Sequence, residues 1–451
     1  MSVVVSESKG TLRPLLRLVW PVLVEQLLVM MVGFSDTVLA GHYLLPEHLA
    51  AMTLISYMLW LLTNLSSFVA IGAVAMTARF VGAQDWEQAN RIVNQSLVLG
   101  AILAAVFTST GLVFCDRLAG VLQLHGASAE FATRYLYFLI SMLPLIMLES
   151  VGIGCLRGAG DMVTGLLTMM VVNAVNIAVS WSLLLGLGPL PAIGWDALPI
   201  GTACGHAVGG LILLTVLGRG RAGLRIQRDM LRPDRPLMRR ILRIGVPGGI
   251  DAISITLCQL AYLSMVDRLG TVAAAAHGVA IRVESLAYLP GYAFQLAAAT
   301  LAGQYLGARD YPQARRSVLV TSAVSGTLMI GVGLLFFFGG RQIVGLLLGP
   351  EQIDVAEVAP TLLRIIAIAM PALGLMQVMI GALRGAGDTR WPLAFTFIGF
   401  LVVRLPLAWY LTERWQWGIE GAWYAMAADV LVRCGLIVGR FLSGRWRRIE
   451  V

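Results

Sequence analysis

Long apolar segments alternate with short polar segments along the whole chain of 451 residues. Each apolar segment has about 20 residues or more, the length that a helix needs to cross the hydrocarbon core of a bilayer. The segments predicted to be membrane-spanning helices are 15–40, 48–75, 92–114, 131–153, 163–187, 196–218, 243–266, 273–303, 317–339, 358–381, 391–411 and 419–441. The pattern therefore predicts an all-α integral membrane protein with twelve transmembrane helices.

Composition and charge agree with a membrane environment. Hydrophobic residues make up 58% of the chain and charged residues 13%, whereas soluble domains are about a quarter charged. The net charge of +8 comes mainly from arginines in the loops that follow even-numbered helices, and cytoplasmic loops carry such an excess. We therefore expect a multi-pass protein of the cell inner membrane, in contact with the lipid bilayer and with both termini in the cytoplasm. The basic charge is explained by topology, so no nucleic-acid partner is expected.

Three motifs recur at half the length of the chain. The phrase at Gly154–Asp161 returns 227 residues later at Gly381–Asp388, and two further pairs keep nearly the same offset. A duplicated apolar chain is typical of transporters that handle their substrate between the two halves. The predicted domains are an N-terminal six-helix bundle at 1–218, a basic cytoplasmic linker at 219–240 and a C-terminal six-helix bundle at 241–451.

The repeated phrases are predicted to form turns. Each contains Arg-Gly-Ala-Gly-Asp between two helices, where glycine permits a tight change of direction. Arg157 and Asp161 are four residues apart, as are Arg384 and Asp388. We expect each pair to close its own turn by an ion pair and to have a structural role.

Acidic residues inside predicted membrane helices are candidates for function, because a charge at membrane depth is costly. Glu25 and Asp36 are 11 residues apart on the first helix and share a face. Glu25 has a counterpart in Asp251, but the position equivalent to Asp36 is Tyr262. An acid present in only one half is expected to be specialised, so Asp36 is the first candidate for the chemistry. Glu25, Asp251 and Tyr262 are candidates for the scaffold or the wall of a cavity.

Polar residues in the fifth and sixth helices have two possible roles. Asn173, Asn176 and Ser180 share one face, and His206 lies within an otherwise small and apolar run. They are candidates to bind a small cation or to set the proton affinity of Asp36. Alternatively, they hydrogen-bond neighbouring helices. For His206 alone, packing within the bundle is the preferred interpretation.

A polar stripe follows the predicted eighth helix and consists of His277, Glu284, Tyr288 and Gln295, flanked by Arg282. Such a stripe is expected to face a wet interior. Pro290 and Gly291 are expected to interrupt this helix. In the last helix Asp429 and Arg433 have the i, i+4 spacing of an ion pair and are interpreted as structural.

At these residues the chain resembles the multidrug and toxic compound extrusion (MATE) family. The motifs that carry the resemblance are Gly-Phe-Ser-Asp-Thr at Gly33–Thr37, the two Leu-Arg-Gly-Ala-Gly-Asp phrases, and the run from Ala276 to Ser285. The resemblance implies two pseudo-symmetric six-helix bundles with a central cavity. It also implies export of amphipathic, often cationic, drug-like compounds in exchange for H⁺ or Na⁺ by alternating access. The acid that matches Asp36 is the family's coupling residue, and polar residues matching Asn176, Ser180 and His206 surround it.

The departures from the family favour H⁺ over Na⁺. The sodium-coupled branch has acids in its second half where this chain has Ile255 and Leu373, and few oxygen ligands are expected around Asp36. We expect no metal or other cofactor, and a monomer. The alternatives are a flippase for lipid-linked oligosaccharides of the same superfamily and a membrane-embedded enzyme. Against an enzyme stands the absence of His-Glu-x-x-His, Gly-x-Ser-x-Gly and P-loop motifs.

Overall fold

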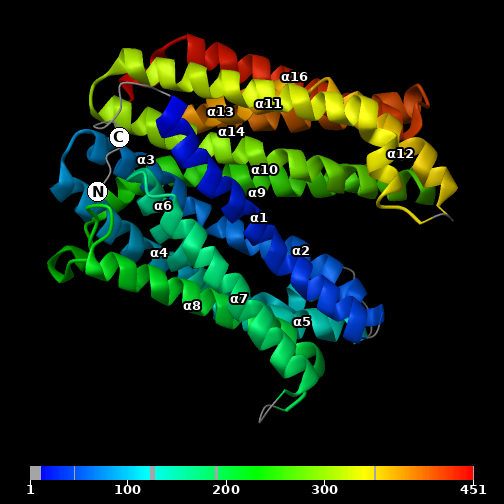
Figure 1. Ribbon diagram of the computed structural model, residues 1–451, viewed down its shortest axis with the longest axis horizontal. Coiled ribbons are helices and arrows are strands. Elements are labelled where there is room, and N and C mark those ends of the chain that lie inside the picture. Colours follow the sequence, from blue (N-terminus) through cyan, green and yellow to red (C-terminus); the bar gives the residue numbers. More distant parts are fainter. Residues whose placement is uncertain (1–11, 45, 122–126, 188–190, 350–351, 450–451) are drawn as a thin grey trace. The chain divides into compact units, whose positions relative to one another are not determined.

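The computed structural model describes residues 12–44, 46–121, 127–187, 191–349 and 352–449 (Figure 1). Two compact units divide the chain. Unit 1 comprises Trp20–Gly249, and unit 2 comprises Ile250–Val451 together with the first part of α1, up to Val19.

Unit 1 is a bundle of helices, two pairs of which are bent spans. Its helices are α1 (Leu12–Tyr43), α2 (Pro46–Leu65), α3 (Ser67–Gly82), α4 (Trp86–Val121), α5 (Ala127–Ser141), α6 (Leu143–Gly158), α7 (Val163–Leu185) and α8 (Ala197–Arg219). The pair α2–α3 bends by 43° and the pair α5–α6 by 55°. Each pair corresponds to one predicted span. The second bend lies at Pro144, whose missing N–H and fixed φ suit the first turn of α6.

Unit 2 repeats this order. Its helices are α9 (Arg235–Asp267), which begins in unit 1, α10 (Thr271–Gly307), α11 (Tyr311–Gly345), α12 (Ile353–Ala367), α13 (Met370–Gly385), α14 (Arg390–Phe397), α15 (Leu405–Trp409) and α16 (Gly418–Leu442). The π-helical segment Ile398–Arg404 joins α14 to α15, and a second one, Tyr410–Arg414, extends α15, so that Arg390–Arg414 forms one span. The pair α12–α13 bends by 53°, at Pro371, which is the repeat counterpart of Pro144.

The twelve predicted spans are accounted for. Among the described residues, eight helices are long and apolar enough to cross a membrane, and the three bent pairs raise this number to eleven. The remaining span is α16, whose 25 residues include the Asp429–Arg433 pair. The prediction of an all-α, twelve-helix membrane protein is therefore confirmed.

The predicted interruption at Pro290 and Gly291 is wrong. The helix α10 is continuous from Thr271 to Gly307, with Pro290 inside it. Proline is tolerated within membrane helices because neighbouring helices and local adjustments satisfy the freed backbone groups. The polar stripe of this helix therefore lies on one unbroken element.

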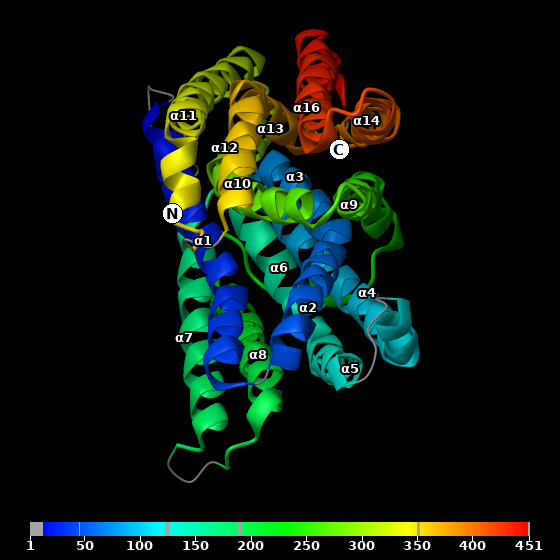
Figure 2. The same ribbon diagram turned by 90° about the vertical axis from the view of Figure 1, so that its right-hand side faces the viewer.

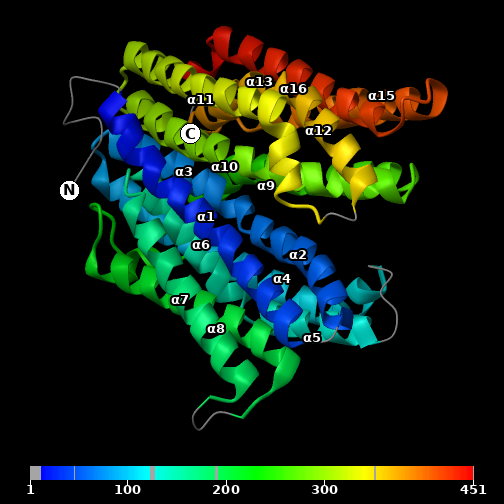
Figure 3. The ribbon, with the colours of Figure 1, turned by 45° about the vertical axis from the view of Figure 1, so that its right-hand side comes forward.

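Small residues allow neighbouring helices to approach closely. In unit 1, α7 lies along α8 and α3 along α6 (Figure 2). In unit 2, α10 lies along α11 and α13 (Figure 3). A Cβ atom on Gly158 would lie 2.8 Å from the carbonyl oxygen of Val74 on α3, and one on Gly385 would meet the carbonyl of Ala299 on α10. The glycines that precede the repeated turns thus have a packing role in both units.

The predicted linker at 219–240 is held against α4. Between the end of α8 and the start of α9, Asn94 donates to the carbonyl of Arg225 and accepts from the N–H of Gln227. Asn90 and Gln95 bind the same segment with both ends of their amides. The first turns of α9 belong to unit 1, so the division between the compact units falls at Gly249–Ile250, beyond the predicted linker.

Candidate functional site

Asp36 on α1 is fully buried, and its carboxylate is held by three neutral groups. Tyr135 on α5 donates its hydroxyl to Oδ2 at 3.0 Å, and Thr202 on α8 donates to the same oxygen at 2.7 Å. Asn176 on α7 donates through Nδ2 to Oδ1 at 3.3 Å. We call these four residues the Asp36 cluster. It brings together four helices of unit 1 around one carboxylate.

The hydrogen bonds within the cluster fix its orientation. Asn176 also donates to Oγ1 of Thr202 at 3.0 Å, and its Oδ1 accepts from the hydroxyl of Ser35 at 3.0 Å. The amide therefore faces Asp36 with its nitrogen. The hydroxyls of Tyr135 and Thr202 each have donor and acceptor capacity, so they suit a carboxylate and a carboxylic acid equally well. The cluster can accommodate Asp36 in both protonation states.

The structure brings only one of the three predicted polar residues of α7 to Asp36. Asn176 contacts the carboxylate, whereas Asn173 donates to the backbone carbonyls of Leu28 and Met169, at 3.0 and 2.9 Å. Ser180 is buried, and its hydroxyl has no hydrogen-bond partner among the described residues.

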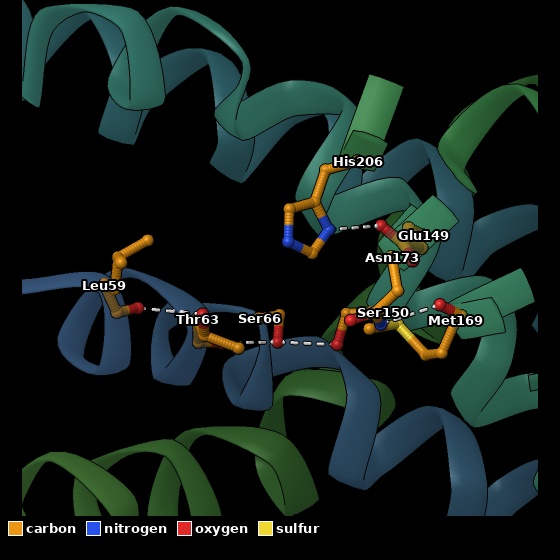
Figure 4. A network of polar contacts seen from close by, with 8 residues as sticks. All are labelled: Leu59, Thr63, Ser66, Glu149, Ser150, Met169, Asn173 and His206. Carbon is orange, nitrogen blue, oxygen red and sulfur yellow. Dashed lines mark hydrogen bonds and ion pairs between the residues drawn. The ribbon is translucent and has the colours of Figure 1, made fainter. Parts of the chain in front are cut away.

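His206 lies one helical turn beyond Thr202 on α8 and contacts a different acid. Its Nδ1 lies 2.9 Å from Oε2 of Glu149 on α6, as Figure 4 shows. The roles of Tyr135, Thr202 and Glu149 were not predicted from the sequence. A signal for Glu149 existed: its repeat counterpart, 227 residues later, is Met376, so this acid also occurs in only one half.

The duplicated acids bind the duplicated arginines. Arg157 at the end of α6 donates to Glu25 at 2.7 Å, and Arg384 at the end of α13 donates to Asp251 at 2.6 Å. The expectation that each arginine pairs with the aspartate four residues later is wrong. Side chains on a helix lean back toward its N-terminus, whereas that aspartate lies beyond the helix end.

The aspartates of the two turns bind other arginines. Asp161 accepts from Arg221 at 2.7 Å, and Asp388 accepts from Arg440 at 2.9 Å. Burial alone would raise the pKa of Asp161, but the hydrogen bonds from Arg221 and Thr164 outweigh it, so this pKa lies below its usual value. Burial raises the pKa of Asp388 above its usual value, despite the opposing effect of Arg440.

Unit 2 contains a buried charge cluster around Asp429. Arg433 donates to both carboxylate oxygens, each at 2.7 Å, as the i, i+4 spacing predicted. Arg404 also binds Asp429, with a nitrogen–oxygen distance of 2.7 Å, and its guanidinium lies 4.4 Å from the centroid of the Phe400 ring. We call Asp429, Arg404 and Arg433 the Asp429 cluster; it has two cations for one anion.

The polar stripe of α10 is largely buried within unit 2. His277, Glu284 and Gln295 are buried, Tyr288 is half-buried, and Arg282 is exposed. Trp423 donates from its indole nitrogen to Nδ1 of His277 at 3.2 Å. Tyr262, the counterpart of Asp36, packs edge-on against the same imidazole, with ring centroids 5.7 Å apart. The equivalent positions of the two units therefore have different chemistry.

Comparisons with known proteins cover almost the whole chain. The sequence profile of the MatE family matches residues 21–182 and 247–410. The chain is 28% identical to the "Probable multidrug resistance protein NorM" of Thermotoga maritima, over 97% of this chain and 94% of that protein. It is 30% identical to the protein of the same name from Pseudomonas aeruginosa, over 98% of this chain and 91% of that protein. A crystal structure described as MATE in the bent conformation superposes with a TM-score of 0.90 at 22% identity, covering 99% of both chains.

Proposed function

We propose that this chain, which belongs to the MatE family of multi-pass membrane transporters, exports amphipathic, often cationic, drug-like compounds in exchange for H⁺. Its similarity to proteins named as multidrug resistance proteins supports the substrate class. The observation that carries the exchange is the fully buried carboxylate of Asp36, surrounded by hydroxyl and amide donors without a permanent cation.

Asp36 would act as the coupling residue of an alternating-access cycle. An isolated ionised carboxylate inside a membrane protein is costly, and a bound proton removes that charge. If protonation and substrate binding oppose one another, each lowers the affinity for the other by the same factor. A proton entering from outside would then promote substrate release, and loss of that proton to the cytoplasm would reset the site.

The described neighbours of Asp36 favour H⁺ over Na⁺. A hard cation in a protein site is typically bound by about six oxygens. Beside the carboxylate, the cluster offers the hydroxyl oxygens of Tyr135 and Thr202, while the amide oxygen of Asn176 already accepts from Ser35. A proton needs no such cage.

Export of a fluorescent cationic dye from inverted vesicles tests this proposal. A pH gradient in sodium-free buffer is expected to drive transport, an uncoupler to stop it, and added sodium to change little. The matched control is the same vesicle preparation with a sodium gradient and no pH gradient. Transport driven only by the sodium gradient would overturn proton coupling, and transport driven by neither would overturn exchange altogether.

We also propose that both termini face the cytoplasm in the inner membrane, because the basic segment at 219–240 and the arginines near the C-terminus have the charge of cytoplasmic loops. Single cysteines in a cysteine-free background are expected to be protected from an impermeant reagent at Arg228 and Arg447, and labelled at Asp354. An exposed Arg447 with a protected Asp354 would invert the orientation.

A further inference from the structure

One buried acid–base pair differs from all the others in the nature of its base. The described residues form nine ion pairs, and in eight of them the base is arginine. Arginine stays protonated at every accessible pH, whereas histidine titrates near neutrality. The exception is Glu149 with His206. This pair alone among the nine can give up the proton that it holds.

The carboxyl group of Glu149 has room for a proton. The side chain is buried, with the residue 3% exposed, and Oε2 faces Nδ1 of His206 at 2.9 Å (Figure 4). Its other oxygen, Oε1, is buried without a hydrogen-bond partner among the described residues. Gly209 on α8 leaves this space open, because a Cβ atom there would lie 2.8 Å from Oε1. A buried polar oxygen without a hydrogen-bond donor carries a free-energy cost, which a proton on the carboxyl group would reduce.

The side-chain oxygen of Asn173, close to Glu149, also lacks a hydrogen-bond donor among the described residues. Asn173 donates both amide hydrogens, to the carbonyls of Leu28 and Met169, so its orientation is fixed by those bonds. Its Oδ1 therefore remains an acceptor, and it is buried without a donor in the part of the chain that the structure describes. Val172, the residue before it, and the carboxyl group of Glu149 both lie beside Gly209, within 2.9 Å of the position that a Cβ atom would take there. Two buried acceptor oxygens in this part of unit 1, Oε1 of Glu149 and Oδ1 of Asn173, thus lack a donor among the described residues. A bound proton would supply one donor.

The pair is adjacent to the Asp36 cluster. On α8, Thr202 binds Asp36 and His206 binds Glu149, and residues four apart lie on the same face of a helix. Besides Glu149, Asp36 is the charged group that acts electrostatically on His206. Among the described residues, the other helices packed on α6 and α8 contribute neutral groups here, such as Asn173 of α7, and Ser66, the residue before α3, binds Ser150.

We propose that Glu149 and His206 form a second proton-binding site in unit 1, separate from Asp36. With the proton bound, imidazolium donates to carboxylate or carboxylic acid donates to imidazole, and the pair is neutral in both forms. Loss of the proton leaves one negative charge, so the proton belongs to the pair rather than to either residue. Because Asp36 is close, the charge of each acid disfavours loss of the proton from the other. Use of this proton in export rests on the proposed function, but its binding does not.

Counting protons on the purified protein tests this site without any transport. The protein in detergent is moved from alkaline to mildly acidic pH in weak buffer, and the protons taken up per chain are measured. Glu149→Gln is expected to take up one proton fewer than the parent protein, because a buried imidazolium at His206 without a counter-ion is costly. Glu149→Asp is expected to restore the count. Asp36→Asn is expected to lose a different proton, so that the double variant loses two.

The matched control is Glu25→Gln. Glu25 is equally buried and also has one carboxylate oxygen without a hydrogen-bond partner among the described residues, but its base is an arginine. This variant is therefore expected to take up as many protons as the parent. If Glu149→Gln does not fold, Glu149→Met, which copies the repeat counterpart Met376, gives the same count. An unchanged count in the folded Glu149 variant would overturn this inference, whether or not the protein exports drugs. A failure of pH-driven export with the proton count as expected would overturn only the proposed function.

Discussion

Asp36 in unit 1 and Asp429 in unit 2 are both fully buried aspartates, but their partners differ. Asp36 accepts from a phenol, a hydroxyl and an amide, all neutral. Asp429 accepts from two arginines. An arginine compensates the charge permanently and with strong, directional hydrogen bonds. The negative charge of Asp429 is thus compensated by two permanent cations, whereas the hydrogen-bond partners of Asp36 leave its charge without a permanent counter-ion.

The same contrast separates the repeated acids from the unrepeated ones in unit 1. Glu25, which has a counterpart in the second half, binds Arg157. Asp36 and Glu149, which have no acidic counterpart, bind neutral donors or a histidine. In unit 1 the duplicated acid is thus paired with a permanent cation, as its counterpart Asp251 is in unit 2. The two acids of unit 1 proposed to bind protons, Asp36 and Glu149, have no arginine partner among the described residues.

The largest effect is expected at Asp36. Asp36→Asn keeps the side-chain volume and one acceptor but neither titrates nor carries a charge, so gradient-driven export should fall to the background of empty vesicles. The measurement is dye export at equal amounts of folded protein in the membrane. Export within about twofold of the parent would remove Asp36 from the mechanism, since twofold corresponds to only about 0.4 kcal/mol.

Asp429→Asn is expected to affect folding instead of coupling. Removal of this carboxylate leaves Arg404 and Arg433 buried without a counter-ion, and breaking a buried ion pair on one side costs about 3–5 kcal/mol. A lower midpoint of thermal unfolding and less protein in the membrane should follow. The fraction that folds should still respond to a pH gradient. Normal stability with loss of coupling would reverse the roles assigned to the two clusters.

A smaller loss is expected at the repeated scaffold. In Asp251→Asn, Arg384 keeps a weaker acceptor and has some access to water, with its side chain 16% exposed. Loss of a hydrogen bond to a charged group then costs about 1–3 kcal/mol. Folded protein should decrease while export per folded molecule is largely retained. Glu25→Gln is the matched change in unit 1 and should behave alike; strong loss of export in either variant would give that acid a role in transport.

Much of the fold could be predicted from the sequence, because the length of an apolar segment is a direct physical requirement of the bilayer. The bends between α5 and α6 and between α12 and α13 were not predicted. Pro144 and Pro371 mark both positions, but the angle depends on how neighbouring helices pack. The continuous α10 shows the converse case, because the packed bundle accommodates Pro290 within a single helix.

The candidate site was predicted in part. Asp36 could be found because its repeat counterpart is Tyr262, and the same criterion would have found Glu149. Tyr135 and Thr202 could not be selected, because tyrosine and threonine are ordinary residues of membrane helices and no spacing connects them to Asp36. Arg157 was predicted to pair with Asp161 but binds Glu25 on another helix, a contact that no spacing indicates either. Contacts across helices depend on helix rotation and on where each helix ends, which local spacing does not encode.

The smallest effects are expected at the two repeated turns, and they should have opposite pH dependence. Asp161 has a lowered pKa, so its stabilising contribution is present above the unfolded value of about 3.9 and is lost as pH falls through the folded pKa. Asp388 has a raised pKa, so its contribution is present below about 3.9 and is lost as pH rises through the folded pKa. Because the ion pair of Asp161 involves a half-exposed arginine, its effect should be about 1 kcal/mol or less. Thermal unfolding of Asp161→Asn and Asp388→Asn, each against the parent protein over a series of acidic pH values, measures both slopes. If the difference in stability between variant and parent changed with pH in the same direction at both turns, the opposite pKa shifts of Asp161 and Asp388 would be contradicted.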